Sequence, residues 1–156
     1  MFLPRDGKVV DLNPTVDTAA YASGDVVFAP VEITDAVLNT KGLAYLRTLV
    51  VLDAADIKGA IDLLFFDRDP GSIAALNAAV VLSATQLSYL IGYVVVASAD
   101  YVTITVANNA VAVKSPGLFL PAKQGSKSFW VAGVARGAID YVAATDLRIK
   151  LMLERQ

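Results

Sequence analysis

The sequence predicts an all-β fold: a single-domain β-sandwich (jelly-roll-like) or a barrel of about eight or nine strands, with one or two short helices. Three observations lead to this fold class. Apolar and polar residues alternate with a period of two along much of the chain, as in half-buried strands. Turn-forming residues separate these stretches at intervals of roughly ten residues, which favours a sandwich or barrel over βαβ units. The length of 156 residues suits one domain with a sizeable core.

The chain begins with a segment that differs from the rest. Residues 1–23 carry Pro4, Gly7 and Pro14 among small side chains, and no helical stripe is sustained there. We therefore expect an extended N-terminal arm over residues 1–23, with at most one short strand, and a β-sandwich domain over residues 24–156; an ordinary frayed terminus is the alternative for residues 1–23.

Segments with a period of two are expected to form the strands of this domain, at 25–29, 31–34, 43–52, 58–66, 93–97, 101–106, 110–113, 129–132 and 146–154. Pro30 separates the first two segments, which indicates an edge position or a break, because proline cannot donate to a ladder. Asn108 and Asn109 are expected to form a hairpin turn, since asparagine tolerates the positive φ that such turns need.

The last segment alternates most clearly. Leu147, Ile149, Leu151 and Leu153 face one way, and mostly polar side chains face the other, which predicts a strand with one wet face. In contrast, residues 43–52 and 61–66 are apolar on most of both faces. Such strands need cover on two sides, and we expect it from a second sheet and from other subunits.

Helical structure is expected only in two short stretches, each preceded by a serine that can cap it. Ser72 predicts a helix through Ala79, and Ser83 predicts a second through Leu90. The uncharged stretch 70–99 is long enough to cross a bilayer, but polar residues and a Pro-Gly turn interrupt it. We therefore expect no membrane span.

The composition excludes several kinds of chemistry. The chain has no histidine and no cysteine, which removes Ser-His-Asp triads, Cys-His pairs, disulfides and zinc sites built from these residues. The net charge of -2 argues against nucleic-acid binding. Hydrophobic residues make up 56% of the chain and charged residues only 18%. This is more apolar surface than a small monomer needs and indicates protein partners.

Four aspartates are the candidates for carboxylate chemistry. Asp53 and Asp56 flank one turn, and Asp67 and Asp69 flank another. A pair of this kind can bind a hard cation or act as the acid and base of a glycosidase. An ordinary turn has the same pattern, because aspartate caps its own backbone and proline presets φ. We favour the turn interpretation and expect no metal.

Three further features are weaker candidates. Gly133–Gly137 lacks the Gly-Lys-Ser/Thr ending of a phosphate loop and indicates a bend or bulge. Lys123–Ser128 is expected to be a solvated loop rather than a Ser-Lys catalytic pair. Core and interface packing is the expected role of the larger aromatic side chains, which include Tyr89, Tyr93, Tyr101, Phe129, Trp130 and Tyr141. No catalytic, cofactor-binding or metal-binding residue is therefore assigned, and the protein is not expected to be an enzyme.

Three stretches carry a resemblance to a known class of proteins. They are Tyr21-Ala22-Ser23-Gly24-Asp25-Val26-Val27-Phe28, Leu46-Arg47-Thr48-Leu49-Val50-Val51-Leu52-Asp53, and Ile61-Asp62-Leu63-Leu64-Phe65-Phe66-Asp67 with Pro70. Together they resemble small virion structural proteins of tailed bacteriophages, including capsid decoration (cement) proteins. The resemblance covers roughly residues 15–70 and is one of pattern, not of a diagnostic motif.

This resemblance implies a non-enzymatic protein that decorates and stabilises a bacteriophage capsid. Such proteins are β-sandwiches on the outer shell, commonly trimers, so the implied partners are the major capsid protein and further copies of this chain. The implied location is the capsid exterior of the virion, after assembly in the host cytoplasm. Two alternatives stay open: a tail, knob or fibre-base structural protein, and a glycan-binding or carboxylate-dependent glycan-degrading β-sandwich.

Overall fold

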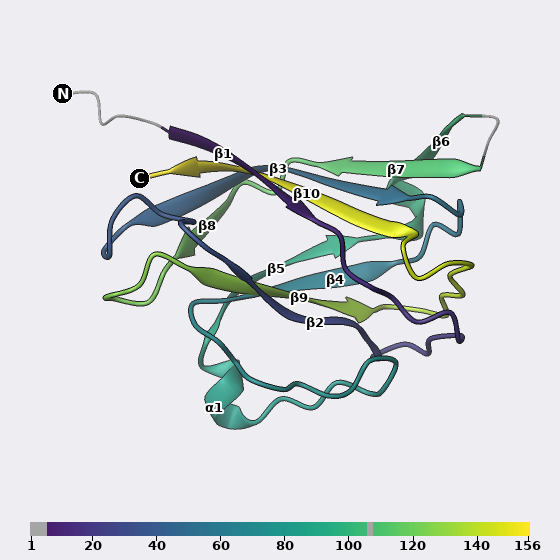
Figure 1. Ribbon diagram of the computed structural model, residues 1–156, viewed down its shortest axis with the longest axis horizontal. Helices are drawn as coiled ribbons and strands as arrows, with labels where there is room; N and C mark the ends of the chain where they lie inside the picture. Colours follow the sequence, from purple (N-terminus) through teal and green to yellow (C-terminus); the bar gives the residue numbers. More distant parts are fainter. Residues whose placement is uncertain (1–5, 106–107) are drawn as a thin grey trace.

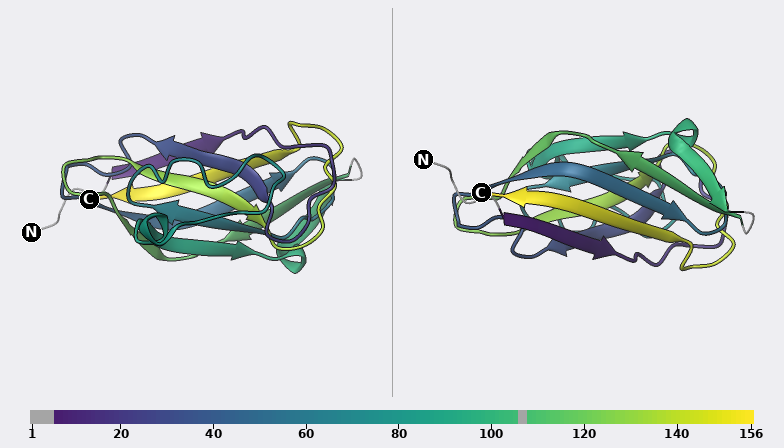
Figure 2. Two further views of the ribbon diagram at one scale, coloured as in Figure 1. Left: turned by 90° about the horizontal axis from the view of Figure 1, so that it is seen from below. Right: turned by 90° about the horizontal axis from the view of Figure 1, so that it is seen from above.

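The computed structural model describes residues 6–105 and 108–156. In this part of the chain, two antiparallel sheets pack face to face (Figures 1 and 2). The strands are β1 (Asp6–Leu12), β2 (Val26–Ile33), β3 (Leu43–Asp53), β4 (Ile61–Phe66), β5 (Leu90–Val96), β6 (Tyr101–Thr105), β7 (Asn109–Lys114), β8 (Leu118–Pro121), β9 (Phe129–Ala135) and β10 (Leu147–Arg155). Two single turns of helix accompany them, α1 (Ala84–Leu87) and the 3₁₀ turn η1 (Ser98–Asp100).

The larger sheet has the order β1-β10-β3-β7-β6, with β8 also paired to β3, and the smaller sheet has the order β2-β9-β4-β5. The first and last strands are neighbours in one sheet, and the second and next-to-last are neighbours in the other. This interleaving is the jelly-roll arrangement. Both sheets end in edge strands, so the predicted β-sandwich is confirmed and the barrel alternative is wrong.

Alternating side chains build the core between the sheets. In β10, Leu147, Ile149, Leu151 and Leu153 are buried, as predicted, while Arg148 and Met152 are exposed. Opposite them, the inward side chains of the smaller sheet are also fully buried; they include Ile61, Leu63, Phe65, Phe129 and Val131. The period of two therefore determines which residues fill the interior.

Pro30 lies within one strand and does not divide two. β2 runs continuously from Val26 to Ile33, but its pairing with β9 shifts register between Phe28 and Val31. Because β2 is an edge strand with an irregular ladder at this point, the missing N–H of proline is tolerated. The expected edge position of Pro30 is therefore confirmed.

The N-terminal segment is extended, but its described part is integrated into the sandwich. β1 pairs with β10 along its whole length, from Asp6 opposite Arg155 to Leu12 opposite Ile149. Val16 and Tyr21 are buried in the core further along. The segment supplies an edge strand for β10 and apolar side chains for the core. Residues 1–5 of the expected arm lie outside the described part of the chain.

Residues 67–89, here called the covering segment, pass over the outer face of the smaller sheet (Figure 1). The expected helix from Ser72 to Ala79 does not form, because the backbone pairs with β2 instead. Asn77 N–H donates to Val26 O at 2.9 Å, and Val26 N–H donates to Ala78 O at 2.9 Å. The prediction of a helix at Ser72 is therefore wrong.

The second expected helix forms as the single turn α1. Ser83 accepts the N–H of Gln86 through its hydroxyl, and the Gln86 side chain accepts the N–H of Ser83, which is a capping box. The helix stops at Leu87 because Leu90 pairs with Phe66 as the first residue of β5. The predicted start is confirmed, and the predicted length is wrong.

The hairpin expected at the asparagine pair is also present. β6 and β7 pair antiparallel, and Asn108 has a φ of 59°, in the left-handed region. Residues 106 and 107 of this connection lie outside the described residues. In the part of the chain that the structure describes, no helix is long and apolar enough to cross a membrane.

Candidate functional site

The first aspartate pair stabilises a turn. Asp53 is 1% exposed at the end of β3. Its Oδ1 accepts the N–H of Ala55 at 3.0 Å, and its Oδ2 accepts the N–H of Lys58 at 2.6 Å. Asp56 accepts the Thr103 hydroxyl at 2.9 Å and lies 3.5 Å from the Lys58 ammonium. Asp53 therefore caps the backbone of its own turn, as the turn interpretation predicts, whereas Asp56 pairs with side chains, one of them from β6.

The second pair behaves in the same way. Both carboxylate oxygens of Asp67 accept from the Arg68 guanidinium, at 2.8 and 2.9 Å, and this guanidinium lies 4.5 Å from the centre of the Tyr89 ring. Asp69 accepts the N–H of Gly71 at 2.7 Å, which closes the turn. Among the described residues, no group of three or more potential metal-ligating side chains is brought together.

The glycine-containing segment Gly133–Gly137 is largely strand. Gly133 lies in β9 beneath the ring of Phe28, and a side chain there would overlap this ring. Arg136 follows the strand, and its Nε lies 3.1 Å from Asp62 Oδ1. The glycine therefore serves close packing between neighbouring strands rather than phosphate binding.

The loop Lys123–Ser128 joins β8 to β9. Its backbone is tied to two other turns, because Lys123 N–H donates to Asp67 O at 3.2 Å and Gly125 N–H donates to Thr40 O at 3.0 Å. The hydroxyl of Ser126 accepts the N–H of Ser128 at 3.1 Å. This serine thus has a structural partner within its own loop.

Three of the six aromatic candidates are buried. Tyr101, Phe129 and Tyr141 belong to the main core, and burial raises the pKa of both tyrosine hydroxyls well above the ordinary range. Tyr101 donates from its hydroxyl to Gly59 O at 3.0 Å. Trp130 packs under the covering segment, whereas Tyr93 is exposed at the edge strand β5. These rings form no common platform.

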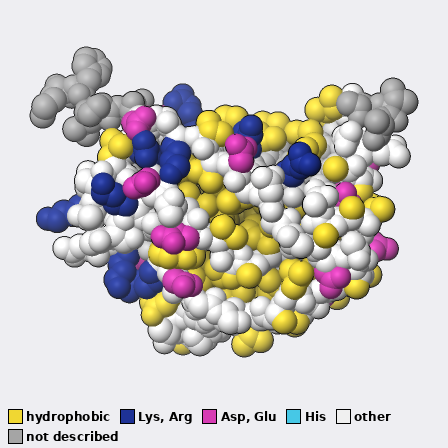
Figure 3. Space-filling model, viewed as in Figure 1, with side chains coloured by type: hydrophobic (Ala, Val, Ile, Leu, Met, Phe, Trp, Pro, Cys, Tyr) yellow, Lys and Arg dark blue, Asp and Glu magenta, His cyan; other side chains and the backbone are white. Residues whose placement is uncertain are grey.

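The larger sheet has an apolar outer side. Side chains from five strands gather there, and we call them the outer apolar face: Val9, Val50, Leu52, Val102, Val111, Val113 and Met152. Direct cross-strand pairing places Val102, Val111 and Leu52 in one row and Val113 and Val50 in the next. Val102 and Val113 are 63% and 62% exposed. Figure 3 shows hydrophobic side chains along the upper border of the molecule, where the larger sheet lies, and between the sheets.

The charged groups beside the outer apolar face are mostly paired within the chain. Lys150 Nζ lies 3.4 Å from Asp11 Oδ1, and Arg47 lies 3.0 Å from Glu154. Arg148 adds one positive charge next to Leu52. The face is therefore an apolar patch on β3, β6 and β7 next to a row of charged groups on β10 and β1, with Val9 and Met152 beyond that row, and it is close to neutral.

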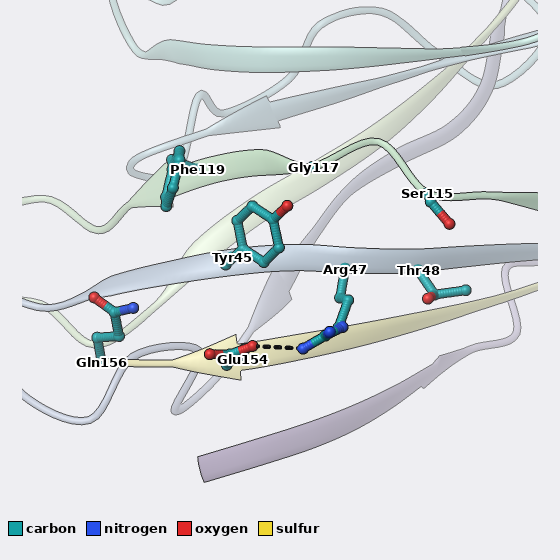
Figure 4. Close-up of a pocket in the computed structure, with 8 residues that line it drawn as sticks. All are labelled: Tyr45, Arg47, Thr48, Ser115, Gly117, Phe119, Glu154 and Gln156. Carbon is teal, nitrogen blue, oxygen red and sulfur yellow. Dashed lines mark hydrogen bonds and ion pairs between the residues drawn. The ribbon is translucent and has the colours of Figure 1, made fainter. Parts of the chain in front are cut away.

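A second feature lies at the other end of the same sheet. A hollow of about 560 Å³, here called the aromatic hollow, is lined by Tyr45, Arg47, Thr48, Ser115, Gly117, Phe119, Glu154 and Gln156. Tyr45 pairs across the ladder with Phe119 on one side and Glu154 on the other (Figure 4). The rings of Tyr45 and Phe119 are 5.0 Å apart and inclined by 50°.

This aromatic pair could not be predicted from the sequence. Tyr45 and Phe119 are far apart in the sequence and meet only because β8 pairs with β3. The one local indication is the break Ser115-Pro116-Gly117, which ends β7 and lets the chain return to β3 as a second short strand. In comparisons with known proteins, no model of a protein family matches this chain, and no curated protein is significantly similar to it.

Proposed function

We propose that this chain is a non-enzymatic structural protein that decorates and stabilises a bacteriophage capsid, as a homotrimer on the outer shell. The observation that carries the proposal is the outer apolar face, which the described chain leaves open to solvent. The resemblance of residues 15–70 to phage virion proteins supports the same class. A jelly-roll sandwich is compatible with it, because this arrangement occurs in viral capsid domains as well as in lectins.

The size of the expected contact favours repeated rather than single binding events. Full burial of one valine or methionine side chain stabilises by about 1.5–3 kcal/mol, and the exposed members of the face are already partly covered by their neighbours. Association itself costs about 4–15 kcal/mol. One such contact is therefore weak, but contacts repeated around a threefold axis and along a shell reinforce one another.

The charge distribution supports a contact with other copies of this chain. The Asp11–Lys150 pair is internal, so covering it leaves neither charge without its partner. Because the face is nearly neutral, equivalent faces that approach a symmetry axis do not repel each other strongly. The major capsid protein is the proposed second partner.

The test combines size-exclusion chromatography with light scattering and sedimentation with purified phage shells. The parent chain is expected to form trimers and to sediment with the shells. The double variant Val102→Lys/Val113→Lys is expected to be monomeric but still folded, with an unchanged circular dichroism spectrum, because both side chains are exposed in one subunit. The control Val81→Lys changes an equally exposed valine in the covering segment and is expected to assemble like the parent.

Two outcomes would contradict the proposal. A parent chain that remains monomeric at high concentration and does not sediment with shells has no decorating function. A chain that purifies with tails instead of shells belongs to the tail, knob or fibre-base class.

A further inference from the structure

The aromatic hollow combines an apolar surface, formed by two aromatic rings, with a border of polar and charged side chains. Phe119 is 56% exposed, because the short strand β8 gives this large apolar side chain little cover. Tyr45 lies beside it, half-buried, with its ring inclined to that of Phe119. The two rings therefore form an angled apolar surface in the lining of the hollow and are not a part of the core.

Polar groups surround these rings on the side of β10. Arg47 and Glu154 are held 3.0 Å apart, and Thr48, Ser115 and Gln156 complete the lining. Together they offer guanidinium, hydroxyl and amide donors as well as carboxylate, hydroxyl and amide acceptors. The charges of Arg47 and Glu154 cancel, so the hollow favours a neutral ligand rich in hydrogen-bonding groups over an anion or a cation.

A glycine keeps the hollow open above the tyrosine. Gly117 has a φ of 61°, a conformation that favours glycine. A Cβ at this position would lie 3.1 Å from the hydroxyl oxygen of Tyr45. The bare backbone thus leaves the hydroxyl of Tyr45 free to take part in the lining. The volume, about 560 Å³, is within the range of about 300–1,000 Å³ that is usual for small-molecule sites.

We propose that the aromatic hollow binds a neutral oligosaccharide. One pyranose ring stacks its C–H face on Tyr45 and Phe119, and its hydroxyl groups exchange hydrogen bonds with Arg47, Glu154 and Gln156. A sugar is the ligand class that presents an apolar face and a ring of donors and acceptors on one small body. The inference depends only on the residues of the hollow and is independent of the proposed assembly function.

The test is a titration followed by ¹H–¹⁵N NMR of the full chain. Maltohexaose, cellohexaose and chitohexaose are the neutral probes, and a heparin-derived hexasaccharide is the anionic probe; a glycan array extends the neutral set. At least one neutral probe is expected to cause saturable shifts of the Tyr45, Gly117 and Phe119 amides. The anionic probe is expected to cause none there at physiological salt.

Variants assign the binding to the hollow. Phe119→Ala is expected to weaken binding of the neutral probe at least about tenfold, which corresponds to 1.4 kcal/mol. Phe119→Trp is expected to retain it, because the stacking surface remains. Arg47→Ala, at a position exposed enough to leave the fold intact, is expected to weaken binding independently of the rings. Tyr93→Ala removes an exposed ring outside the hollow and is the matched control.

Three results would overturn the proposal. The first is that no neutral probe causes saturable shifts and no neutral glycan binds on the array. The second is equal binding by Phe119→Ala and Tyr93→Ala. The third is binding of the anionic probe alone. Light scattering on Phe119→Ala separates the two functions, because loss of sugar binding with intact trimers affects only the hollow.

Discussion

The two sheets of the sandwich both have apolar outer faces, and the described chain covers only one of them. On the smaller sheet, Phe66 and Ala132 are fully buried beneath the covering segment, which is anchored by Ile73. On the larger sheet, Val102 and Val113 are mostly exposed, although they project from neighbouring strands in the same way.

This difference shows that strands that are apolar on both faces can be covered in two ways, by the chain itself or by a partner. Strands that are apolar on both faces must be covered twice. β4 obtains its second cover from a segment that directly follows it in the chain, which costs loop entropy but no partner. β3 has no such segment over its outer side among the described residues, so Val50 and Leu52 remain half-buried. The larger sheet is therefore the face on which partners are expected.

The largest expected effect distinguishes the inner from the outer side of the larger sheet. Ile149→Asp places a charge among buried side chains of β10 and is expected to unfold the domain, because an unpaired buried charge costs several kcal/mol. Met152→Asp introduces the same charge on the outer face of the same strand and is expected to change stability by less than about 1 kcal/mol. Thermal melting followed by circular dichroism measures both. Similar melting of Ile149→Asp and the parent would mean that β10 is assigned to the wrong face.

The next effect tests whether the covering segment is a real part of the core. Ile73→Ala is expected to cost about 2–4 kcal/mol, because it leaves a cavity between the segment and Phe66. Val81→Ala, in the same segment but exposed, is expected to cost less than about 0.5 kcal/mol. Urea denaturation gives both values, and hydrogen exchange shows whether the amides of Asn77 and Val80 lose protection with Ile73→Ala. Equal costs would mean that the segment lies on the sheet without stabilising it.

Most strands, although not β8, could be predicted because their information is local. The alternation in 147–153 and at Ile61, Leu63 and Phe65 identifies the inward faces without knowledge of the partners. The helix expected at Ser72 fails for the opposite reason. A cap and a run of small residues satisfy the local rules, but Asn77 adopts a φ of 56° and pairs with β2. That competing edge is distant in the sequence.

The candidate sites divide in the same manner. The turn roles of Asp53 and Asp69 could be predicted, because each accepts from an N–H two residues ahead. The aromatic hollow could not, because Tyr45 and Phe119 become neighbours only through the register of β3 and β8. Likewise, composition indicated an excess of apolar surface, but only the topology shows that exposed valines of neighbouring strands gather on the larger sheet.

A smaller effect concerns α1 within the covering segment. Ser83→Ala removes the hydroxyl that caps α1 and is expected to cost about 1 kcal/mol. Ser72→Ala is the matched control, since Ser72 satisfies the same local rule but contributes its carbonyl, which accepts from the Gln86 amide. It is expected to change stability by less than about 0.5 kcal/mol. A result in which Ser72→Ala is the more costly of the two would place the capped helix at the wrong serine.

The smallest effect concerns the ion pair of Asp62 and Arg136, which lies at one end of the outer face of the smaller sheet. Asp62 projects from β4 beside Arg136, and burial raises the pKa of its carboxyl above the ordinary value of 3.8, an effect that Arg136 only partly offsets. The folded state therefore binds a proton more tightly than the unfolded state. The contribution of Asp62 to stability is greatest below pH 3.8 and decreases as the pH rises through its folded pKa. Asp62→Asn is thus expected to be slightly more stable than the parent at pH 7, by less than about 1 kcal/mol.

The pKa of Asp100 is shifted in the opposite direction, so a variant at Asp100 complements this test. Its carboxylate accepts from Lys114 at 2.7 Å and from the N–H of Ala97 at 2.8 Å, and both bonds lower its pKa below 3.8. Its contribution is present above pH 3.8 and is lost as the pH falls through the folded pKa. Asp100→Asn is therefore expected to be less stable than the parent at pH 7, with a deficit that shrinks in acid, while the advantage of Asp62→Asn shrinks as well. Urea denaturation at pH 3 and pH 7 measures both differences. If both variants are less stable than the parent at pH 7, burial does not dominate at Asp62, and the charged pair stabilises this end of the sheet.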